Sequence, residues 1–298
     1  MTTVEHIRLE TPDLPLSGLL CLPETQQPVG LVVALHGGSY TAGYWHADTM
    51  PEASLLLLGA SLGYAVLALD RPGYGLSIGW PLARQRLAFQ ADTVFDVIHD
   101  FVSKNPMLQG KPVFLIGHSM GGILSLMMGA HAKASGLAGI DVSGVPLRYP
   151  PGMLDLIKQQ AAHAANAPFL PERPAQEMHG IFYGPPETYW PQALLHDAAI
   201  HAKVPSPEMF DAAGCPDELP PMMQKITVPV QLTIPALEKS SVGGPDSLDY
   251  ARQFLNGSRR VVTYLQEGSG HNISLHKVAR AYHLRAMAFF DECRHLPD

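Results

Sequence analysis

Three short, uninterrupted apolar runs constrain the fold more than any other feature of this sequence. Residues 31–35, 64–69 and 112–116 each place apolar side chains on both faces of a potential strand. Such strands are typical of parallel sheets, which helices cover on both sides. Segments with helical spacing lie between the runs, at about 49–62 and 84–104, so strand and helix alternate. The pattern predicts an α/β fold with a mostly parallel sheet.

Further strands extend this sheet towards both ends of the chain. Strands at 4–10 and 16–22 are separated by a segment with two prolines, which predicts an N-terminal hairpin. Three more strands are expected in the second half of the chain, at about 137–143, 228–234 and 260–265. A helix near 246–256, with Asp246 as its expected N-cap, separates the last two.

One long segment interrupts the alternation of strands and helices. Residues 146–226 are rich in Pro, Ala, Met and His, contain candidate short helices and have no buried-strand pattern. A structureless loop of this length is uncommon in a compact domain, so we predict an inserted cap or lid. The core then has two parts, residues 1–145 and 227–298.

The composition is that of a globular enzyme and not of a disordered or nucleic-acid-binding chain. Hydrophobic residues make up 46% of the sequence and charged residues only 16%. The formal net charge is −7, and no run of Lys or Arg forms the positive stripe that a phosphate backbone requires. We therefore expect a small-molecule substrate and no nucleic-acid partner.

The first residues and the cysteines favour an intracellular protein without cofactors. Acidic residues and Pro precede any apolar run long enough for a signal peptide or a membrane span, so we expect a cytoplasmic protein without membrane association. Cys21, Cys215 and Cys293 lie far apart in the sequence and form no CxxC pair, so we expect them to be reduced thiols. The 14 histidines include no HExxH, so neither a metal nor another cofactor is expected. The oligomeric state is open, with a homo-oligomer as one option.

A serine lies where the third apolar run meets a helix. Ser119, in Gly117-His118-Ser119-Met120-Gly121, follows the strand directly and precedes a helical segment that reaches Ala134. A turn this sharp leaves no room for side chains at the glycine positions. It exposes the serine oxygen and presents a helix N-terminus to a developing negative charge. An isolated GxSxG is also compatible with a purely structural turn.

Four motifs in a characteristic order remove that ambiguity. They are Gly-His-Ser-Met-Gly-Gly, His36-Gly37-Gly38, the segment 70–77 (Asp-Arg-Pro-Gly-Tyr-Gly-Leu-Ser) and the segment 268–272 (Gly-Ser-Gly-His-Asn). In these motifs the chain resembles the α/β-hydrolase superfamily over nearly its whole length. The resemblance implies an α/β-hydrolase fold with an inserted cap, and an esterase or thioesterase that uses Ser119 as nucleophile.

The resemblance also implies a base and an acid for Ser119, because a serine hydroxyl needs an imidazole to take its proton and a carboxylate to orient that imidazole. His271 matches the position of the superfamily's catalytic histidine. The acid should follow the strand that ends near Ile234, where Glu238 replaces the usual Asp. Three residues remain alternative acids, with helix capping or strand packing as their other roles: Asp246, Asp249 and Asp141. His118 is expected to be a packing residue.

The oxyanion hole requires backbone N–H groups aimed at the oxygen that becomes negative. Met120 should supply one and Gly38 the other, with Ser39 as an alternative if the turn is shifted. His36 and the segment 70–77 are expected to have structural roles.

The substrate is constrained only coarsely. The predicted cap contains many Ala, Met and Pro residues and no cluster of Arg or Lys, which favours a mainly hydrophobic pocket. Its aromatic residues are Phe169, Phe182, Tyr183, Tyr189 and Trp190. We expect hydrolysis of a carboxylic ester, thioester or lactone by a Ser-His-Glu triad through an acyl-enzyme.

Other functions remain open on the same fold. A C–C bond hydrolase and an aminopeptidase use the same triad, and some members of the superfamily are non-catalytic ligand-binding proteins. An aminopeptidase would need an acidic site for the substrate amine, for which the cap offers Glu172, Glu177 and Glu187. Dehalogenases and epoxide hydrolases need a carboxylate nucleophile, so Ser119 argues against them.

Overall fold

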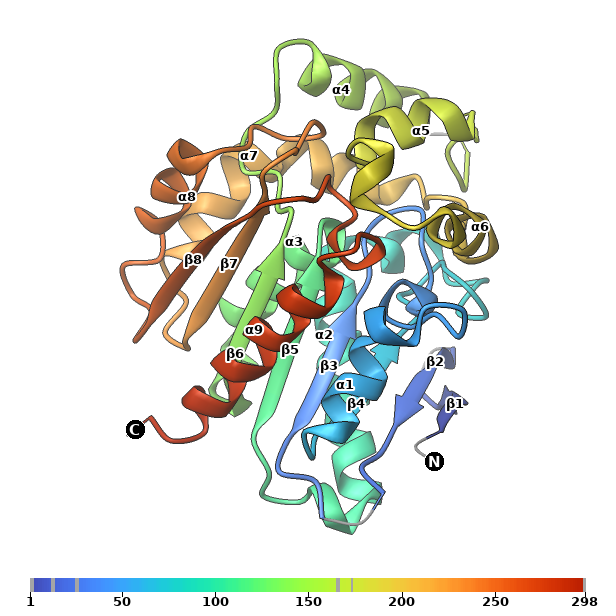
Figure 1. Ribbon diagram of the computed structural model, residues 1–298. Helices are drawn as coiled ribbons and strands as arrows, with labels where there is room; N and C mark the ends of the chain where they lie inside the picture. The colour runs from blue at the N-terminus through green and yellow to red at the C-terminus, as the bar shows by residue number, and fades with distance from the viewer. Residues whose placement is uncertain (1–2, 12–13, 25–26, 165–166, 173, 297–298) are drawn as a thin grey trace.

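A sheet of eight strands runs through the computed structural model, which describes residues 3–11, 14–24, 27–164, 167–172 and 174–296 (Figure 1). In chain order the strands are β1 (Val4–Leu9), β2 (Leu16–Cys21), β3 (Leu31–Leu35), β4 (Ala65–Leu69), β5 (Val113–His118), β6 (Leu137–Ser143), β7 (Val230–Pro235) and β8 (Val261–Gln266). Across the sheet their order is β1-β2-β4-β3-β5-β6-β7-β8.

The pairing of the strands confirms the predicted mostly parallel sheet with an N-terminal hairpin. Strand β2 is antiparallel to both β1 and β4, whereas the other neighbouring strands run parallel. Two residues of the hairpin turn, Pro12 and Asp13, lie outside the described residues.

The central strands are buried along their whole length, which explains the uninterrupted apolar runs. In β3, Val33 and Leu35 pack into the hydrophobic cluster on one face of the sheet, and Val32 and Ala34 into the cluster on the other face. Because neither face meets water, no position of the strand favours a polar side chain.

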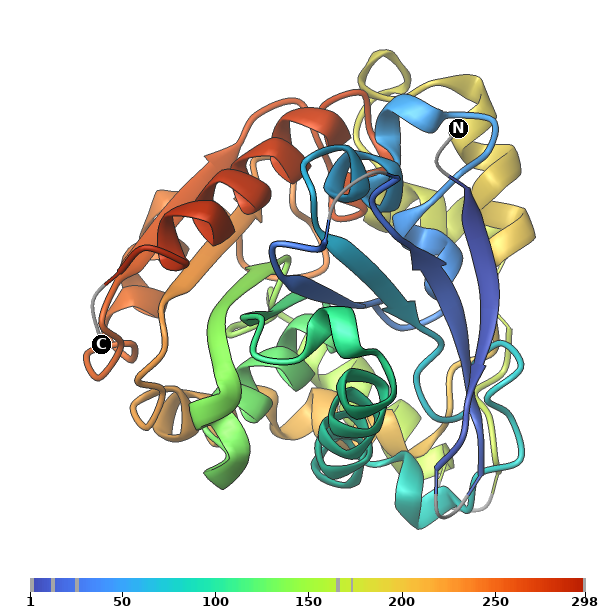
Figure 2. The same cartoon turned by 90° about the horizontal axis from the view of Figure 1, so that it is seen from below.

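Helices cover both faces of the sheet, as the view from below shows (Figure 2). α1 (Leu55–Ser61) and α9 (Ala279–Cys293) contribute to one hydrophobic cluster. α2 (Leu87–Lys104), α3 (Met120–Gly129) and α8 (Pro245–Arg252) contribute to the other. The described residues also form short 3-10 helices: Ala42–Trp45, Pro51–Ala53, Leu82–Gln85, Pro106–Leu108, Ala132–Gly136, Pro186–Thr188 and Ile273–Leu275.

Two helices begin at other residues than expected. The helix predicted at 49–62 is shorter, because the Ser54 side chain caps α1. The predicted N-cap role of Asp246 is wrong: Gly244 is the N-cap of α8, Pro245 is the first helical residue, and Asp246 lies in the first turn. Proline is favoured at the first helical position because its fixed φ suits a helix and it has no N–H to leave unpaired.

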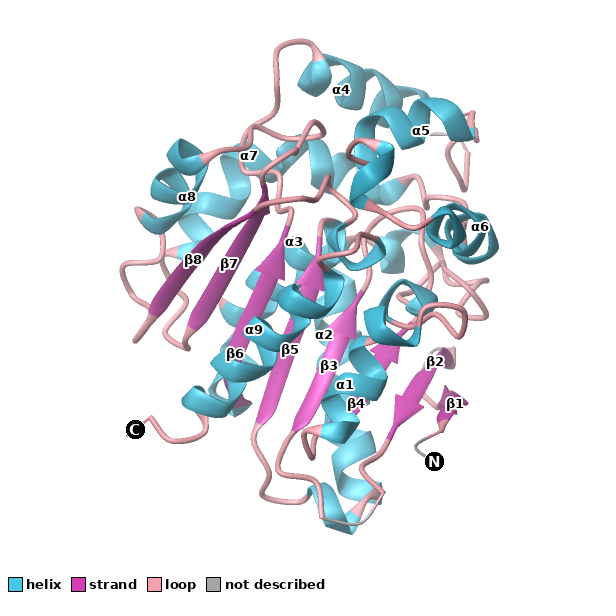
Figure 3. Cartoon of the chain, in the orientation of Figure 1, coloured by secondary structure: helices cyan, strands magenta, loops and turns pink. Residues whose placement is uncertain are grey.

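Between β6 and β7, the described residues form four α-helices. They are α4 (Met153–Ala164), α5 (Ala175–Phe182), α6 (Pro191–Ile200) and α7 (Pro207–Met223). Helices α4 and α5 lie beyond the carboxyl ends of the strands (Figure 3). By contrast, buried side chains of α7, among them Leu219 and Met223, belong to the hydrophobic cluster of the sheet. The predicted cap of residues 146–226 therefore includes a helix packed on the core, and a separate cap stays a prediction.

Helix α7 continues through prolines at positions 216, 220 and 221. A proline cannot donate a hydrogen bond to the carbonyl four residues earlier. For Pro216 that carbonyl belongs to Ala212, and it accepts a hydrogen bond from Tyr149 Oη at 2.9 Å instead. A tertiary contact thus replaces a bond that the helix cannot make.

No helix in the described part of the chain is long and apolar enough to cross a membrane.

We predict that Leu219→Ala lowers the free energy of unfolding by about 2–5 kcal/mol, as buried leucines typically do. Leu219 is 2% exposed, whereas Leu195 on α6 is 74% exposed and provides the matched control. Leu195→Ala should change stability by no more than about 0.5 kcal/mol. Urea unfolding measures both, and equal small losses would contradict the packing of α7 on the core.

Candidate active site

Ser119 occupies a strained turn between β5 and α3. Its φ of +52° lies in the left-handed region that non-glycine residues seldom adopt. The Ser119 N–H donates to the carbonyl of Ser143 at 2.8 Å, which ties the turn to the end of β6. Beyond the end of β5, Ser119 lines a cavity.

The glycines on either side of Ser119 are required by close backbone packing. A Cβ on Gly121 would overlap the carbonyl of Leu35 in β3, and a Cβ on Gly117 would overlap the carbonyl of Gly121. These positions accept only hydrogen, because the overlapping atoms belong to backbone that cannot move aside. The same approach brings the turn against the segment that follows β3.

A carboxylate and an imidazole meet at the carboxyl ends of β7 and β8. Glu238 follows β7, and its Oε2 lies 2.7 Å from Nδ1 of His271, in the loop after β8. The two side chains are 0% and 4% exposed. Burial would raise the pKa of Glu238, but His271 and hydrogen bonds from Ser240 outweigh it and lower that pKa. The carboxylate therefore stays ionised beside the imidazole.

The partners of Glu238 decide which nitrogen of His271 carries the proton. Oε1 of Glu238 accepts from Ser240 N–H at 2.8 Å, Ser240 Oγ at 2.7 Å and Ser241 N–H at 3.3 Å. Oε2 is left to accept from Nδ1 of His271, which assigns the proton to Nδ1. Nε2 of His271 then carries the lone pair that can accept a proton.

The alternative acids occupy other places. Asp141 is buried in β6, where it accepts hydrogen bonds from Tyr282 Oη and Gln231 Nε2, both at 2.6 Å. Burial raises its pKa to about 6. Asp246 and Asp249 are exposed on α8. Of the four nominated acids, Glu238 is the one that forms a hydrogen bond with His271.

The candidate oxyanion donors line the same cavity as Ser119 and His271: Gly38, Ser39 and Met120. Met120 is the first residue of α3, so its N–H has no partner within the helix. Ser39 has a φ of +69°, and its carbonyl accepts from Ala202 N–H at 2.9 Å. That bond ties the loop after β3 to the chain beyond α6.

The other histidines of the motifs pack inside the protein. His118 is fully buried, stacks on Tyr44 at a ring distance of 4.6 Å, and has Nδ1 3.1 Å from Ser143 Oγ. His36 is fully buried beneath the loop that contains Gly38. Both residues therefore have the packing environment expected of them.

Apolar side chains form a large part of the cavity wall, and few of the cap's aromatic residues are among them. Of the five nominated aromatics, only Phe182 lines the cavity, whereas Tyr183 is buried and donates to Asp197. Aliphatic and sulfur-containing side chains from the segment 146–226 also line the cavity: Pro146, Met153, Ile157, Leu170, Met178, Ile181, Val204, Met209 and Ala212. Methionine is flexible and adapts to ligands of different shape.

Of the three acidic residues nominated for an amine site, one lines the cavity and two do not. Glu172 lines it and lies 3.5 Å from Lys203, which also lines it. Glu177 and Glu187 are exposed and do not line the cavity. Among the described residues, no group of three His, Cys, Asp or Glu side chains is arranged to hold a metal ion.

Sequence reasoning missed residues that hold His271 and its loop in place. Ser240 Oγ lies 3.0 Å from Nδ1 of His271 while it donates to Glu238. His276 Nε2 accepts from Gly184 N–H and Gly270 N–H, both at 3.1 Å, and so joins the loop of His271 to the end of α5. Burial lowers the pKa of His276 to about 4, which suits this acceptor role. No local pattern marks either residue.

The chain is similar to known hydrolases. Residues 32–282 match the family model of the alpha/beta hydrolase family. A stretch of 106 residues is 35% identical to monoglyceride lipase of Homo sapiens. It covers 35% of this chain and 32% of that protein, so the match spans about a third of the relative.

Solved structures share the fold over nearly the whole chain. A soluble variant of monoglyceride lipase from Saccharomyces cerevisiae, in complex with a substrate analog, has a TM-score of 0.75 at 17% identity, covering 100% of this chain and 97% of that one. A thermostable carboxyl esterase from Bacillus coagulans has a TM-score of 0.72 at 15% identity, covering 99% and 100%.

We predict that Gly121→Ala destabilises the protein by about 3 kcal/mol, because the added methyl group meets backbone that cannot yield. Gly136→Ala is the control, since a Cβ there has no heavy atom within 4 Å. It should change stability by about 0.5 kcal/mol or less. Thermal unfolding of both variants checks the prediction. A Gly121→Ala variant as stable as the wild type would show that the turn does not approach β3 so closely.

Proposed function

Because the chain belongs to the alpha/beta hydrolase family, we propose that it is a serine hydrolase that cleaves a carboxylic ester, including a lactone, or a thioester of a mainly hydrophobic substrate. One observation carries the proposal. His271, which is buried and paired with Glu238 at 2.7 Å between Nδ1 and the carboxylate, lines the same cavity as Ser119 on its strained turn. A nucleophile, a base and a carboxylate are thus available at one place.

In the acylation step, Nε2 of His271 takes the proton of the Ser119 hydroxyl as Ser119 Oγ attacks the carbonyl carbon of the substrate. Glu238 stabilises the imidazolium that forms and keeps its ring in the required orientation. The carbonyl π electrons move to oxygen, which becomes negative. When the tetrahedral intermediate collapses, the C–O or C–S bond breaks, and His271 gives its proton to the leaving alcohol or thiol.

In the deacylation step, water replaces the leaving group. His271 takes one proton of the water molecule while the remaining hydroxide attacks the acyl carbon. Collapse of the second tetrahedral intermediate releases a carboxylic acid and returns the proton to Ser119. In both steps the N–H groups of Gly38 and Met120 would hold the negative oxygen, and each such donor typically contributes about 3 kcal/mol of transition-state stabilisation.

The cavity wall supports a substrate with an apolar acyl or alcohol part. Residues from the segment 146–226, which we propose as the cap, supply its aliphatic and methionine side chains. The similarity to monoglyceride lipases supports fatty-acyl esters as the first substrates to test. The pairing of Glu172 with Lys203 gives less support to an aminopeptidase, because that carboxylate already has a cationic partner.

We predict that a fluorophosphonate labels the wild type but not Ser119→Ala, because the reagent reacts with an activated serine. His271→Ala and Glu238→Gln should each lower kcat for a p-nitrophenyl ester by about 10⁴-fold, since the base and its orientation are lost. Mass spectrometry detects the label, and steady-state kinetics give kcat.

Asp246→Asn is the control for the acid, because this exposed carboxyl group lies on α8. It should retain wild-type kcat and labelling. An unlabelled wild type would remove the basis for a serine hydrolase, and a larger loss in Asp246→Asn than in Glu238→Gln would exclude Glu238 as the acid.

We also predict that kcat/KM rises with acyl length over a series of esters and thioesters, by up to about fourfold for each methylene group that the cavity buries. The series should include monoacylglycerols and esters with a carboxylate at the acyl terminus, which we expect to react poorly in an apolar cavity. Preference for the charged acyl groups would contradict the proposed substrate class.

A further inference from the structure

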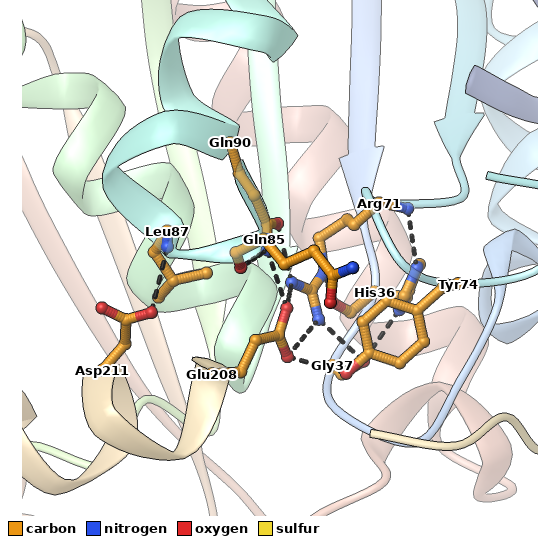
Figure 4. A network of polar contacts seen from close by, with 9 residues as sticks. All are labelled: His36, Gly37, Arg71, Tyr74, Gln85, Leu87, Gln90, Glu208 and Asp211. Carbon is orange, nitrogen blue, oxygen red and sulfur yellow. Dashed lines mark hydrogen bonds and ion pairs between the residues drawn. The ribbon is translucent and has the colours of Figure 1, made fainter. Parts of the chain in front are cut away.

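A buried ion pair joins helix α7 to Arg71, the second residue after β4 (Figure 4). Arg71 and Glu208 have side chains that are 0% exposed, and both guanidinium Nη atoms donate to the carboxylate: Nη1 to Oε1 and Nη2 to Oε2, the latter at 3.2 Å. Tyr74 Oη and Gln90 Nε2 also donate to Glu208, at 2.7 and 2.9 Å. The carboxylate is therefore held from several sides and fixes the position of the guanidinium.

Arg71 also binds the backbone of the loop after β3. Its Nε donates to the carbonyl of His36 at 2.9 Å, and its Nη2 donates to the carbonyl of Gly37 at 3.3 Å. Nδ1 of His36 donates to that same Gly37 carbonyl at 2.7 Å, while its Nε2 accepts from Arg71 N–H at 3.1 Å. Burial and the charge of Arg71 lower the pKa of His36 well below its usual value, so the ring stays neutral and can both donate and accept.

The direction of the Gly37 carbonyl determines the direction of the next N–H. The peptide bonds of the described residues are trans, so the Gly37 carbonyl and the Gly38 N–H point in opposite directions. Since the carbonyl points at Arg71, the Gly38 N–H points away from it. Ser119 lies close to this loop, because a Cβ on Gly37 would be 3.1 Å from its Cβ. Gly38, Ser119 and Met120 line one cavity.

We propose that Arg71 and Glu208 are positioning residues that set the direction of the Gly38 N–H in the oxyanion hole. The inference rests on the proposed function and adds the residues that prepare its transition-state site. Glu208 holds the guanidinium, and the guanidinium holds two successive carbonyls. Loss of either residue weakens the hold on the His36 and Gly37 carbonyls and leaves His36 Nδ1 as the remaining side-chain donor to the Gly37 carbonyl. The peptide between Gly37 and Gly38 can then tilt, so that its N–H is aimed less well at the negative oxygen.

Helix α7 contains a matched control for a purely structural role. Asp211, three residues after Glu208, accepts from Leu87 N–H at 3.0 Å and from Arg86 Nε at 2.9 Å, and its side chain is 9% exposed. It therefore anchors α7 to the start of α2, whereas Glu208 anchors α7 to the residue that binds the oxyanion loop (Figure 4). Asp211→Asn weakens the attachment of α7 without a direct effect on the carbonyls of His36 and Gly37.

The experiment compares Glu208→Gln and Arg71→Lys with Asp211→Asn in the full-length protein. It measures kcat and KM for a p-nitrophenyl ester. It also measures the inhibition constants of a trifluoromethyl ketone, which forms a tetrahedral oxyanion with a reactive serine, and of the amide of the same chain, which does not. Thermal unfolding is recorded for each variant.

We expect Glu208→Gln and Arg71→Lys to lower kcat by about 10- to 100-fold, a part of the loss that removal of a whole oxyanion donor causes. KM and the affinity for the amide should stay within about twofold to threefold, while affinity for the trifluoromethyl ketone falls by the same factor as kcat/KM. Asp211→Asn should lower the unfolding temperature and keep kcat within about twofold.

Three outcomes would overturn the inference: an unchanged kcat in Glu208→Gln, equal losses of affinity for ketone and amide, or an equal loss of kcat in Asp211→Asn. If Glu208→Gln does not fold, Arg71→Lys decides by the same criteria, because it retains the opposite charges and loses only the forked geometry. A wild type that a fluorophosphonate does not label would overturn the proposed function as well, whereas a labelled wild type with insensitive variants would overturn the positioning role alone.

Discussion

The close approach between the turn around Ser119 and the backbone of β3 is the contact on which the candidate site depends. Gly121 lies so near the Leu35 carbonyl that only a hydrogen fits at its Cα. Because Gly38 follows β3 and Ser119 follows β5, this approach sets the separation between the proposed oxyanion donors and the nucleophile. The strain of the left-handed Ser119 backbone is retained because the sheet holds the strand before it and α3 holds the residues after it.

The parallel arrangement of the sheet supplies the remaining groups. Strands β3, β5, β7 and β8 end at one edge, so residues as distant in sequence as Gly38 and His271 line one cavity. Glu238 stands where the superfamily usually has an aspartate, and its longer side chain is held by three hydrogen bonds from Ser240 and Ser241. These bonds explain how a glutamate with one more methylene group keeps a defined position beside the imidazole.

Charges buried away from water connect helix α7, which lies between β6 and β7, to this edge. An isolated buried carboxylate or guanidinium would lose several kcal/mol of hydration, so each is retained only with full hydrogen bonding. Arg71 and Glu208 satisfy that condition together with Gln90, Tyr74 and the carbonyls of the loop after β3. Helix α7 thereby contributes Met209 and Ala212 to the cavity wall. Through Glu208 and Arg71 it also supports the loop after β3.

The sequence by itself determined the features that depend on near neighbours. The runs at 31–35, 64–69 and 112–116 predicted the central strands, because burial on both faces excludes polar residues. The glycines around Ser119 predicted its sharp turn. The motifs pointed to His271, and the place after the strand that ends near Ile234 favoured Glu238, with Asp246, Asp249 and Asp141 as alternatives. The structure places Glu238 Oε2 2.7 Å from His271 Nδ1.

Only the tertiary structure decided the contacts between distant segments. It paired Arg71 with Glu208 across 137 residues of sequence and supplied Tyr149 to a helix that its prolines would otherwise interrupt. It also decided which apolar residues of the segment 146–226 line the cavity. Periodicity and local sterics are properties of short segments, whereas the partner of a buried polar group depends on how the whole chain packs.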